Sequence, residues 1–369
     1  MAERDDSVGS PLAGTSERIL LVQTGFLGDV VLSLPVVDAL AELYPRSELF
    51  FLTTPGAAGL LRSHPKISQV LTYDKRGADA GLGGLRRMAL KLQQLSISQA
   101  FSLHKSHRTA LLLAFARIPR RYGFAEAAAP WLYHQTAHRT DLSHEVLRNL
   151  ALLRVLGREP TATSRIVLPL DEATMHRAAE LLLQAGERRV VGIAPGSVWP
   201  TKRWTTDGFA AVAAGLSRRG YAVALIGGPE DAAIGAEIER LANVPLLNLI
   251  GQAKLVESAA VIARLEALVT NDSAPLHLAS ATGVPIVALF CATVPEFGFG
   301  PWGVPSRVLE VTGLTCRPCG RHGGRTCPTG THACQWNLFP SRVVRAVDEL
   351  LSERQSETMG TVASGALST

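Results

Sequence analysis

Residues 19–43 read ILLVQTGFLGDVVLSLPVVDALAEL, and their pattern predicts the class of fold. It begins with an apolar run over 19–23, turns through residues 24–29 and continues into an apolar segment over 30–43. The run predicts a buried strand, and the second segment predicts a helix that ends at Tyr44-Pro45. A strand, a short turn and a helix in this order are typical of an α/β protein with a parallel sheet.

The same alternation continues along the chain in two series. Between the series lie a strand-like run over 165–168 and a predicted helix over 171–185. Gly220 stands where a helix of the second series is expected to end. The remaining strands are predicted over 48–52, 69–73 and 99–103 in the first series, and over 189–194, 222–226, 246–250, 267–270 and 286–290 in the second.

Two such series predict two domains. A chain of 369 residues is long for one domain, and the junction divides it into 17–170 and 171–352. We expect two Rossmann-like domains that face one another across a cleft, because ligands of such folds bind at the carboxyl ends of the strands. Residues 1–16 and 353–369 lack an apolar pattern and are predicted to be disordered tails.

The composition is that of an ordinary globular protein, with 47% hydrophobic and 19% charged residues. No apolar run reaches the roughly 18 residues of a spanning helix, and 1–16 lack the apolar stretch of a signal peptide, so a cytoplasmic location is expected. The formal charge of +5 either suits an anionic partner or carries no specific meaning. Nucleic acid is not expected as a partner, because the basic residues are scattered and the tryptophans form no stacking series.

The first turn ends in a carboxylate. Its G-x-x-G spacing, Gly25 to Gly28, lacks the G-x-G-x-x-G of a dinucleotide site, so hydride transfer gains no support. Asp29 follows the carboxyl end of a strand, where a base that removes a proton from an acceptor hydroxyl would have to stand. The alternative is that Asp29 caps the following helix, because Asp is favoured at helix N-termini.

Polar loops follow the strands of the second series and suit a nucleoside diphosphate. They lie over 194–204, 227–231, 271–277 and 293–302. Lys202 would neutralise phosphate, and a helix beginning at Ser273 would offer free N–H groups to a pyrophosphate. Ser197 and Ser273 carry hydroxyl donors, and Asp231 or Glu230 would accept from ribose hydroxyls.

Each of these residues also has a simpler interpretation. Lys202 alone is typical of a solvated charge, Asp272 of a helix cap, and His277 of a histidine packed within a helix. Their joint position at strand ends favours the nucleotide site.

With these motifs the sequence resembles the ADP-heptose:lipopolysaccharide heptosyltransferases, inverting glycosyltransferases of the GT-B fold. The resemblance runs from Arg18 to about Leu351. It includes the cysteine-containing segment near the end of the chain, which is similar in heptosyltransferase II-like members. The matching motifs are Gly28-Asp29 with Leu34-Pro35, Arg121 to Phe124, His144 with Arg148-Asn149, Pro195-Gly196-Ser197 with Lys202-Arg203-Trp204, Gly227 to Glu230, and Asn271 to Ala279.

The resemblance implies transfer of heptose from ADP-L-glycero-D-manno-heptose to the inner core of lipopolysaccharide. The first domain would bind the lipid A-Kdo/heptose acceptor and the second the donor, with Asp29 as the general base. Candidate donor-binding residues are Ser197, Lys202, Asp231, Asp272, Ser273, Ala274 and His277, where many relatives have Gly in place of Ala274. Candidate acceptor-binding residues are Thr24, Gly28, Lys105 and Arg121.

No cofactor and no catalytic metal are expected, because Lys202 and a helix end can stabilise the leaving ADP. Peripheral contact with the inner face of the cytoplasmic membrane is one interpretation of the basic segment 85–95, and a solvated helix face is the other. The oligomeric state stays open.

Four cysteines crowd one segment, with the spacing Cys316-x2-Cys319-x7-Cys327-x6-Cys334. They indicate either a structural metal site or a loop of reduced thiols. Two further alternatives for the whole protein are another GT-B transferase or an epimerase with a different nucleotide sugar, and a non-catalytic, metal-carrying binding module.

Overall fold

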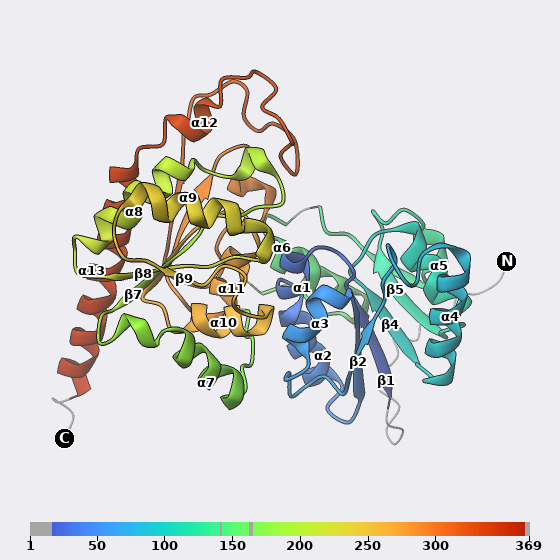
Figure 1. The fold of residues 1–369 in the computed structure, drawn as a ribbon. Helices are drawn as coiled ribbons and strands as arrows, with labels where there is room; N and C mark the ends of the chain where they lie inside the picture. The colour runs from blue at the N-terminus through green and yellow to red at the C-terminus, as the bar shows by residue number, and fades with distance from the viewer. Residues whose placement is uncertain (1–16, 141, 162–164, 366–369) are drawn as a thin grey trace. The chain divides into compact units, whose positions relative to one another are not determined.

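The computed structural model describes residues 17–140, 142–161 and 165–365, and the chain forms two compact units, Met1–Ser164 and Arg165–Thr369 (Figure 1). The tail predicted over 1–16 lies outside the described residues. The units meet six residues before the predicted boundary of 170/171. Residues 165–170 belong to unit 2 because Ile166 and Leu168 are buried there. The Leu168 N–H donates to the Ala281 carbonyl of unit 2 at 3.2 Å.

The sheet of unit 1 has six strands in the order β3-β2-β1-β4-β5-β6, all paired in parallel. The four predicted strands are confirmed. The other two were not predicted, because one begins with two arginines and the other has three residues. The strands are β1 (Arg18–Val22), β2 (Glu48–Thr53), β3 (Gln69–Thr72), β4 (Gln99–Ser102), β5 (Arg120–Phe124) and β6 (Gln135–Ala137).

Helices cover both faces of this sheet (Figure 1). α1 (Leu27–Val31), α2 (Leu34–Leu43) and α3 (Pro55–Leu61) lie on one face, and α4 (Gly81–Gln94) and α5 (His107–Phe115) lie on the other. α6 (Glu145–Leu150) packs against α2 and is followed by a 3-10 helix, Ala151–Leu156.

The prediction of one continuous helix over 30–43 is wrong. α1 ends at Val31, and α2 begins at Leu34 with Ser33 as its N-cap residue. Pro35 causes the break, because it has no N–H to donate to the carbonyl one turn earlier. The Ser33 hydroxyl donates to the Val30 carbonyl at 2.6 Å and stabilises the corner.

Unit 2 repeats the same topology, with strand order β12-β11-β10-β7-β8-β9. Its five predicted strands are confirmed, whereas the half-exposed edge strand β12 was not predicted. The run over 165–168 alternates in burial, but it pairs with no described strand, so its prediction as a strand is wrong. The strands are β7 (Val190–Ala194), β8 (Ala222–Leu225), β9 (Leu247–Asn248), β10 (Ala267–Asn271), β11 (Ile286–Phe290) and β12 (Ser306–Glu310).

The helices of unit 2 also form two layers (Figure 1). α8 (Thr206–Ser217), α9 (Ala232–Ala242) and α13 (Pro340–Gly365) cover one face. α7 (Glu172–Leu181), α10 (Leu255–Ala263) and α11 (Ala274–Thr282) cover the other. Gly220, with φ +87°, confirms the predicted stop after α8, because its N–H donates to the Ser217 carbonyl.

The disordered tail predicted from 353 is wrong as far as Gly365, where α13 ends. Residues 353–359 read ERQSETM, which lacks an apolar stripe but also lacks Pro and Gly. Polar helix-forming residues therefore continue a helix that the apolar residues before them anchor.

Both units have the Rossmann strand order, in which the direction of strand addition reverses at the point between the first and the fourth strand of the unit. That point lies between β1 and β4 in unit 1 and between β7 and β10 in unit 2. Ligands of such sheets bind there, beyond the carboxyl ends of the strands. The loops after these four strands are therefore where a site is expected.

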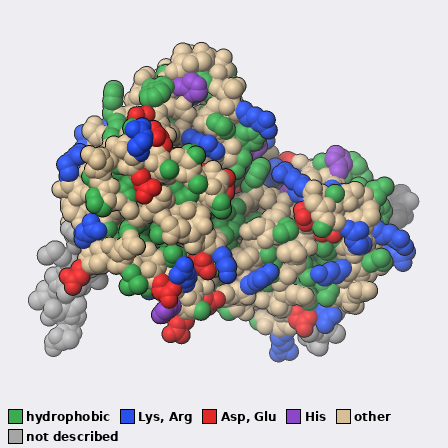
Figure 2. Space-filling model, in the orientation of Figure 1, with side chains coloured by type: hydrophobic (Ala, Val, Ile, Leu, Met, Phe, Trp, Pro, Cys, Tyr) green, Lys and Arg blue, Asp and Glu red, His purple; other side chains and the backbone are tan. Residues whose placement is uncertain are grey.

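The surface shows no segregation of charge on the visible face, where acidic and basic side chains are interspersed (Figure 2). Among the described residues, no helix combines the length and the apolar character needed to cross a membrane.

Candidate active site

Asp29 lies in the first turn of α1, directly after β1. Its Oδ2 accepts the Phe26 N–H at 2.9 Å, so the carboxylate caps α1 from the third helical position, and Phe26 rather than Asp29 is the N-cap residue. Burial raises the pKa of Asp29 to about 6, and the charge of Glu145 acts in the same direction. The Phe26 hydrogen bond and the charges of Arg139 and Lys105 oppose this rise of the pKa. An aspartate with this pKa is ionised at neutral pH and is more basic than an ordinary one, as proton abstraction requires.

Gly25 makes room for this carboxylate. A Cβ at position 25 would lie 2.6 Å from Asp29 Oδ2 and 3.0 Å from Gln23 Oε1. Gln23 in turn accepts the Gly25 N–H at 3.1 Å and holds the turn in place. The glycine is thus required by the close approach of the Asp29 side chain.

A buried ion pair stands behind Asp29. Arg139 Nη2 lies 2.5 Å from Glu145 Oε2, with both side chains less than a tenth exposed, and the guanidinium also lies over the Phe124 ring at 4.8 Å. The two partners shift the Asp29 pKa in opposite directions. Their fixed geometry therefore sets the local field at the carboxylate. They escaped the sequence analysis because they follow Asp29 by more than a hundred residues.

The motif His144, Arg148 and Asn149 supports the same corner. His144 is the N-cap residue of α6, and its Nδ1 accepts the Val146 N–H at 3.2 Å. Asn149 is fully buried, and its Nδ2 donates to the Leu32 carbonyl at the end of α1 at 3.1 Å. The Asn149 contact ties α6 to the helix that carries Asp29.

Lys75 and His104 form a second group at this edge of the sheet, and sequence reasoning missed Lys75. The ammonium of Lys75 donates to the Thr24 carbonyl at 2.7 Å and lies 3.4 Å from His104 Nε2. Burial, with Lys75 and Lys105 nearby, lowers the pKa of His104 to about 4, so the ring is neutral at pH 7. Its Nε2 accepts from the ammonium, and its Nδ1 then donates to Thr109 Oγ1 at 2.8 Å.

The four candidate acceptor residues have different surroundings. Lys105 is exposed after β4, within electrostatic reach of Asp29. Gly28 lies in α1 beside Asp29, whereas Thr24 is buried and contacts Lys75. The structure does not bring Arg121 to this group.

Arg121 stands near the amino end of β5, in register with Ala100 of β4. Its guanidinium donates to the Leu132 carbonyl at 2.9 Å and the Ile118 carbonyl at 2.6 Å. These carbonyls hold the guanidinium near the amino edge of the sheet, so the structure gives no support to the expectation that Arg121 binds the acceptor.

In unit 2 a buried ion pair joins the loops after β7 and β10. Lys202 Nζ lies 2.6 Å from Asp272 Oδ2, with side chains 14% and 7% exposed. Thr293 Oγ1 donates to the same oxygen at 2.7 Å. Lys202 is thus not a solvated charge, and Asp272 does not cap α11, whose N-cap residue is Ser273.

Asn271 fixes the loop that carries Lys202. Its Oδ1 accepts the Trp204 N–H at 2.9 Å, and its Nδ2 donates to the Pro195 carbonyl at 2.7 Å. One buried amide therefore holds both ends of this loop against the carboxyl end of β10.

Asp231 sits where two glycines leave space for it. A Cβ at Gly196 or at Gly227 would lie 2.3 Å or 2.8 Å from its Oδ2. Burial raises its pKa, with a further contribution from Glu230, while the Gly228 N–H hydrogen bond lowers it. A carboxylate this close to the β7 loop can accept from a ligand hydroxyl bound there.

The remaining donor candidates line the same edge. α11 begins directly after β10, with Ser273 as N-cap and Ala274 as its first residue, as predicted. His277 is 4% exposed within α11, and its ring contacts the edge of Phe299. Ser197 follows β7, and its carbonyl accepts the Arg203 Nε–H at 2.7 Å. The structure thus brings all seven donor candidates to the loops and helix starts at one edge of the sheet.

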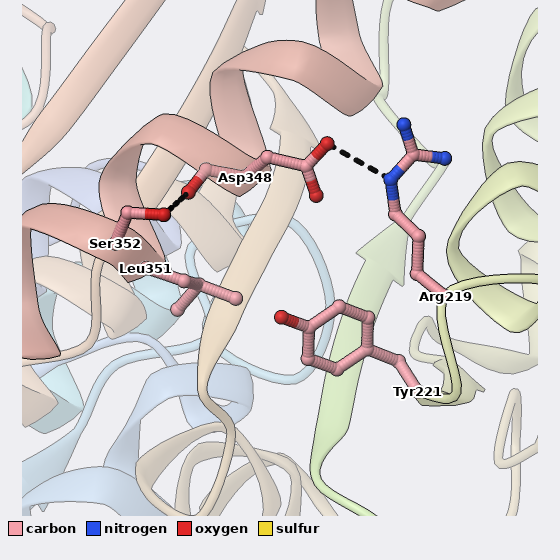
Figure 3. Close-up of a pocket in the computed structure, with 5 residues that line it drawn as sticks. All are labelled: Arg219, Tyr221, Asp348, Leu351 and Ser352. Carbon is pink, nitrogen blue, oxygen red and sulfur yellow. Dashed lines mark hydrogen bonds and ion pairs between the residues drawn. The ribbon is translucent and has the colours of Figure 1, made fainter.

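A hollow elsewhere on unit 2 does not belong to this group. Arg219, Tyr221, Asp348, Leu351 and Ser352 line it, and Arg219 Nε lies 2.8 Å from Asp348 Oδ2 (Figure 3). Tyr221 directly precedes β8, so the hollow lies at the amino edge of the sheet. The candidate donor loops lie at the carboxyl edge.

The cysteines are free thiols. Burial raises the pKa of Cys334 to about 11, and hydrogen bonds, chiefly from Thr329, lower that of Cys327 to about 6. In the part of the chain that the structure describes, no three His, Cys, Asp or Glu side chains gather in a way that would hold a metal ion. A structural metal at these cysteines stays an untested alternative.

Known proteins resemble this chain in sequence and in fold. The sequence model of glycosyltransferase family 9 (heptosyltransferase) matches residues 85–328. Lipopolysaccharide heptosyltransferase 2 of Salmonella typhimurium is 27% identical, over 91% of this chain and 99% of the relative.

Two solved structures cover nearly the whole chain. A family 9 glycosyltransferase from Veillonella parvula has a TM-score of 0.82 at 24% identity, covering 91% of this chain and 98% of its own. Escherichia coli ADP-heptose lps heptosyltransferase II has a TM-score of 0.75 at 25% identity, covering 92% and 99%.

Proposed function

Because the chain belongs to glycosyltransferase family 9, the heptosyltransferase family, we propose that it transfers heptose from ADP-L-glycero-D-manno-heptose to the inner core of lipopolysaccharide. The protein is a glycosyltransferase of the GT-B fold. The names of its relatives support the donor and the acceptor of this proposal. The observation that carries the proposal is the Asp29 carboxylate, capped by Phe26 and raised in pKa at the first loop of unit 1.

Asp29 is the proposed general base. It takes the proton of the acceptor hydroxyl as that oxygen attacks the anomeric carbon of the donor. Direct displacement inverts the configuration at this carbon, and the bond to the ADP oxygen breaks. Capping by Phe26 holds the carboxylate still, so that one group serves the helix and the reaction.

Lys202 and the N-terminus of α11 are proposed to stabilise the ADP leaving group. Charge that develops on the departing phosphate oxygen would meet the ammonium and the partial positive end of the helix. In this proposal Asp231 accepts from ribose hydroxyls, while Ser197, Ser273, Ala274 and His277 line the nucleotide. Asp272 positions Lys202 through the 2.6 Å ion pair.

Lys105 and Lys75 are proposed to bind the acceptor, next to Gly28 and Thr24. Two lysines at one sheet edge favour an anionic acceptor such as the lipid A-Kdo core. The neutral His104 strengthens this assignment, because it fixes the Lys75 ammonium without neutralising it.

Donor and acceptor identity are tested by product analysis. The protein is incubated with ADP-heptose and a set of truncated core acceptors, and the products are identified by mass. We expect an acceptor to gain one heptose, with UDP-sugars inactive. Transfer from UDP-sugars with none from ADP-heptose would overturn the donor assignment and favour another GT-B transferase or an epimerase.

The outer face of α4 and α5 is the proposed membrane contact. Gln93 Nε2 donates to the Phe115 carbonyl, which places the ends of the two helices together. Apolar and basic side chains share this face, as expected of a peripheral anchor to anionic lipid. The exposed residues are Leu82, Leu90 and Phe115, with Arg86, Arg87 and Lys91.

Vesicle binding tests this contact. The double variant Arg86→Glu/Arg87→Glu should bind phosphatidylglycerol vesicles about tenfold more weakly. The double variant Arg342→Glu/Arg345→Glu, at two exposed arginines of α13, reverses the same number of charges and serves as the control. Equal binding by both variants and the wild type would contradict the assignment.

A further inference from the structure

The segment Cys316–Trp336, here called the cysteine segment, lies outside the sheet of unit 2. In Figure 1 it forms the orange-red loop above α8 and α9, and α12 (Ala333–Trp336) is its one described α-helix. Its contacts reach the loop that carries Lys202.

The first contact joins the start of the segment to the end of β11. The Arg317 guanidinium donates to the Phe290 carbonyl at 3.1 Å and to the Thr293 carbonyl at 2.7 Å. The Cys319 N–H donates to the Ala292 carbonyl at 2.9 Å. The segment is thus anchored beside Thr293, which itself hydrogen-bonds the Asp272 partner of Lys202.

The second contact reaches the residue next to Lys202. The Gly324 N–H donates to Thr201 Oγ1 at 2.7 Å, and the Thr201 hydroxyl and N–H donate back to the Gly324 carbonyl at 3.0 and 3.2 Å. The backbone approaches so closely that a Cβ at Gly323 would lie 3.1 Å from Lys202 Cγ. Thr201 itself is 4% exposed, so water cannot readily replace these bonds.

The third contact holds the other side of the loop. The Gln335 side-chain amide donates to the Pro200 carbonyl at 3.2 Å and to the Arg203 carbonyl at 2.5 Å. The Gln335 carbonyl accepts the Trp204 indole N–H at 2.9 Å. Residues before and after Lys202 are therefore both fixed to the cysteine segment.

From these contacts we propose that the cysteine segment positions Lys202 for donor binding, with Thr201 and Gln335 as the positioning residues. The inference rests on the proposed role of Lys202 at the ADP phosphates. Around Lys202 the loop forms a single 3-10 turn, Pro200–Lys202, and such a turn has few hydrogen bonds of its own. Hydrogen bonds from the cysteine segment replace those that the turn lacks. The Lys202 ammonium is therefore held in position before the ligand binds.

The test is ADP affinity, measured by calorimetry on the full chain. Thr201→Val keeps the shape of the side chain and removes the hydroxyl that bonds Gly324. Loss of that bond should weaken ADP binding about fivefold. Thr201→Ser should restore wild-type affinity, because it returns the hydroxyl. Thr282→Val is the matched control, since its hydroxyl bonds the carbonyls of its own helix, and it should leave ADP affinity unchanged.

Two results would overturn the inference. One is unchanged ADP affinity in Thr201→Val, whether or not its melting temperature falls, because that is the mark of a merely structural role. The other is equal loss of affinity in Thr282→Val. Lys202→Ala separates this inference from the proposed function. If Lys202→Ala weakens ADP binding but Thr201→Val does not, only the positioning role fails. If Lys202→Ala has no effect, the proposed donor site fails.

Discussion

The proposed reaction depends on how a single side chain, the Asp29 carboxylate, is held. Asp29 serves as a cap of α1 and stands in a field set by Glu145, Arg139 and Lys105. The sequence left a helix cap and a catalytic base as alternatives for Asp29. The capping bond uses Oδ2, so the second carboxylate oxygen is left to accept a proton. Glu145 and Arg139 could not be predicted, because they become neighbours of Asp29 only through the packing of α6 on α2.

Transfer activity should fall as the pH drops through about 6. The base works only when ionised, so activity should be half-maximal near the pKa of Asp29. That pKa is raised to about 6, from about 4 for an ordinary aspartate. Profiles of kcat/KM from pH 4.5 to 8 measure the midpoint. In Lys105→Met the midpoint should move to higher pH, because the charge of Lys105 lowers the Asp29 pKa. Lys66→Met, at a distant ion pair with Asp38, is the control. A flat profile between pH 5 and 7 would contradict this assignment.

Gly25→Ala should lower kcat/KM about tenfold or more while the protein stays folded. The added Cβ would stand 2.6 Å from Asp29 Oδ2 and force the carboxylate to move. Gly59→Ala in α3 is the control, since no neighbouring atom lies within 4 Å of its Cβ position. Steady-state kinetics and thermal melts of the two variants check this. Wild-type kinetics in Gly25→Ala would show that the carboxylate need not stay in place.

At the scale of elements, buried strands were the easiest to predict. β1 after Arg18, β7 and β11 are continuous apolar runs, as expected of strands covered on both faces. The strands that were not predicted lie toward the sheet edges, where arginines and short length hide the pattern. The corner at Pro35 was also not predicted, because an apolar pattern continues through it.

α13 should divide into a structural half and a dispensable half. A chain ending after Ser352 should melt close to the wild type, because Val343, Val347, Leu350 and Leu351 stay in the core of unit 2. A chain ending after Phe339 should not fold as a stable unit 2. It loses these four buried side chains, which contribute about 6 to 12 kcal/mol, a large share of the stability of a domain. Circular dichroism melts distinguish the two, and cooperative unfolding of the shorter chain at the wild-type temperature would contradict the expectation.

At the scale of the whole molecule, the two units share one strand order and place their candidate residues at equivalent positions. Asp29 in the first turn of α1 follows β1, Lys105 follows β4, and Lys202 and Asp272 follow β7 and β10. The sequence located these loops because polar residues follow apolar strands. It could not anticipate the Lys202–Asp272 pair, Lys75 beside Thr24, or the cysteine segment bonded to Thr201, since each joins residues far apart in the chain.

The role of Asp29 as the base is tested by comparing Asp29→Asn with the wild type in two measurements: heptose transfer and ADP binding. The asparagine keeps the size of the side chain and an oxygen to accept the Phe26 N–H, but it cannot take a proton from a hydroxyl. Heptose transfer from ADP-heptose should fall by about a hundredfold or more, while the ADP dissociation constant stays unchanged. Wild-type transfer by Asp29→Asn would show that this carboxylate is not the base, and absence of any transfer by the wild type would contradict the proposed heptosyl transfer.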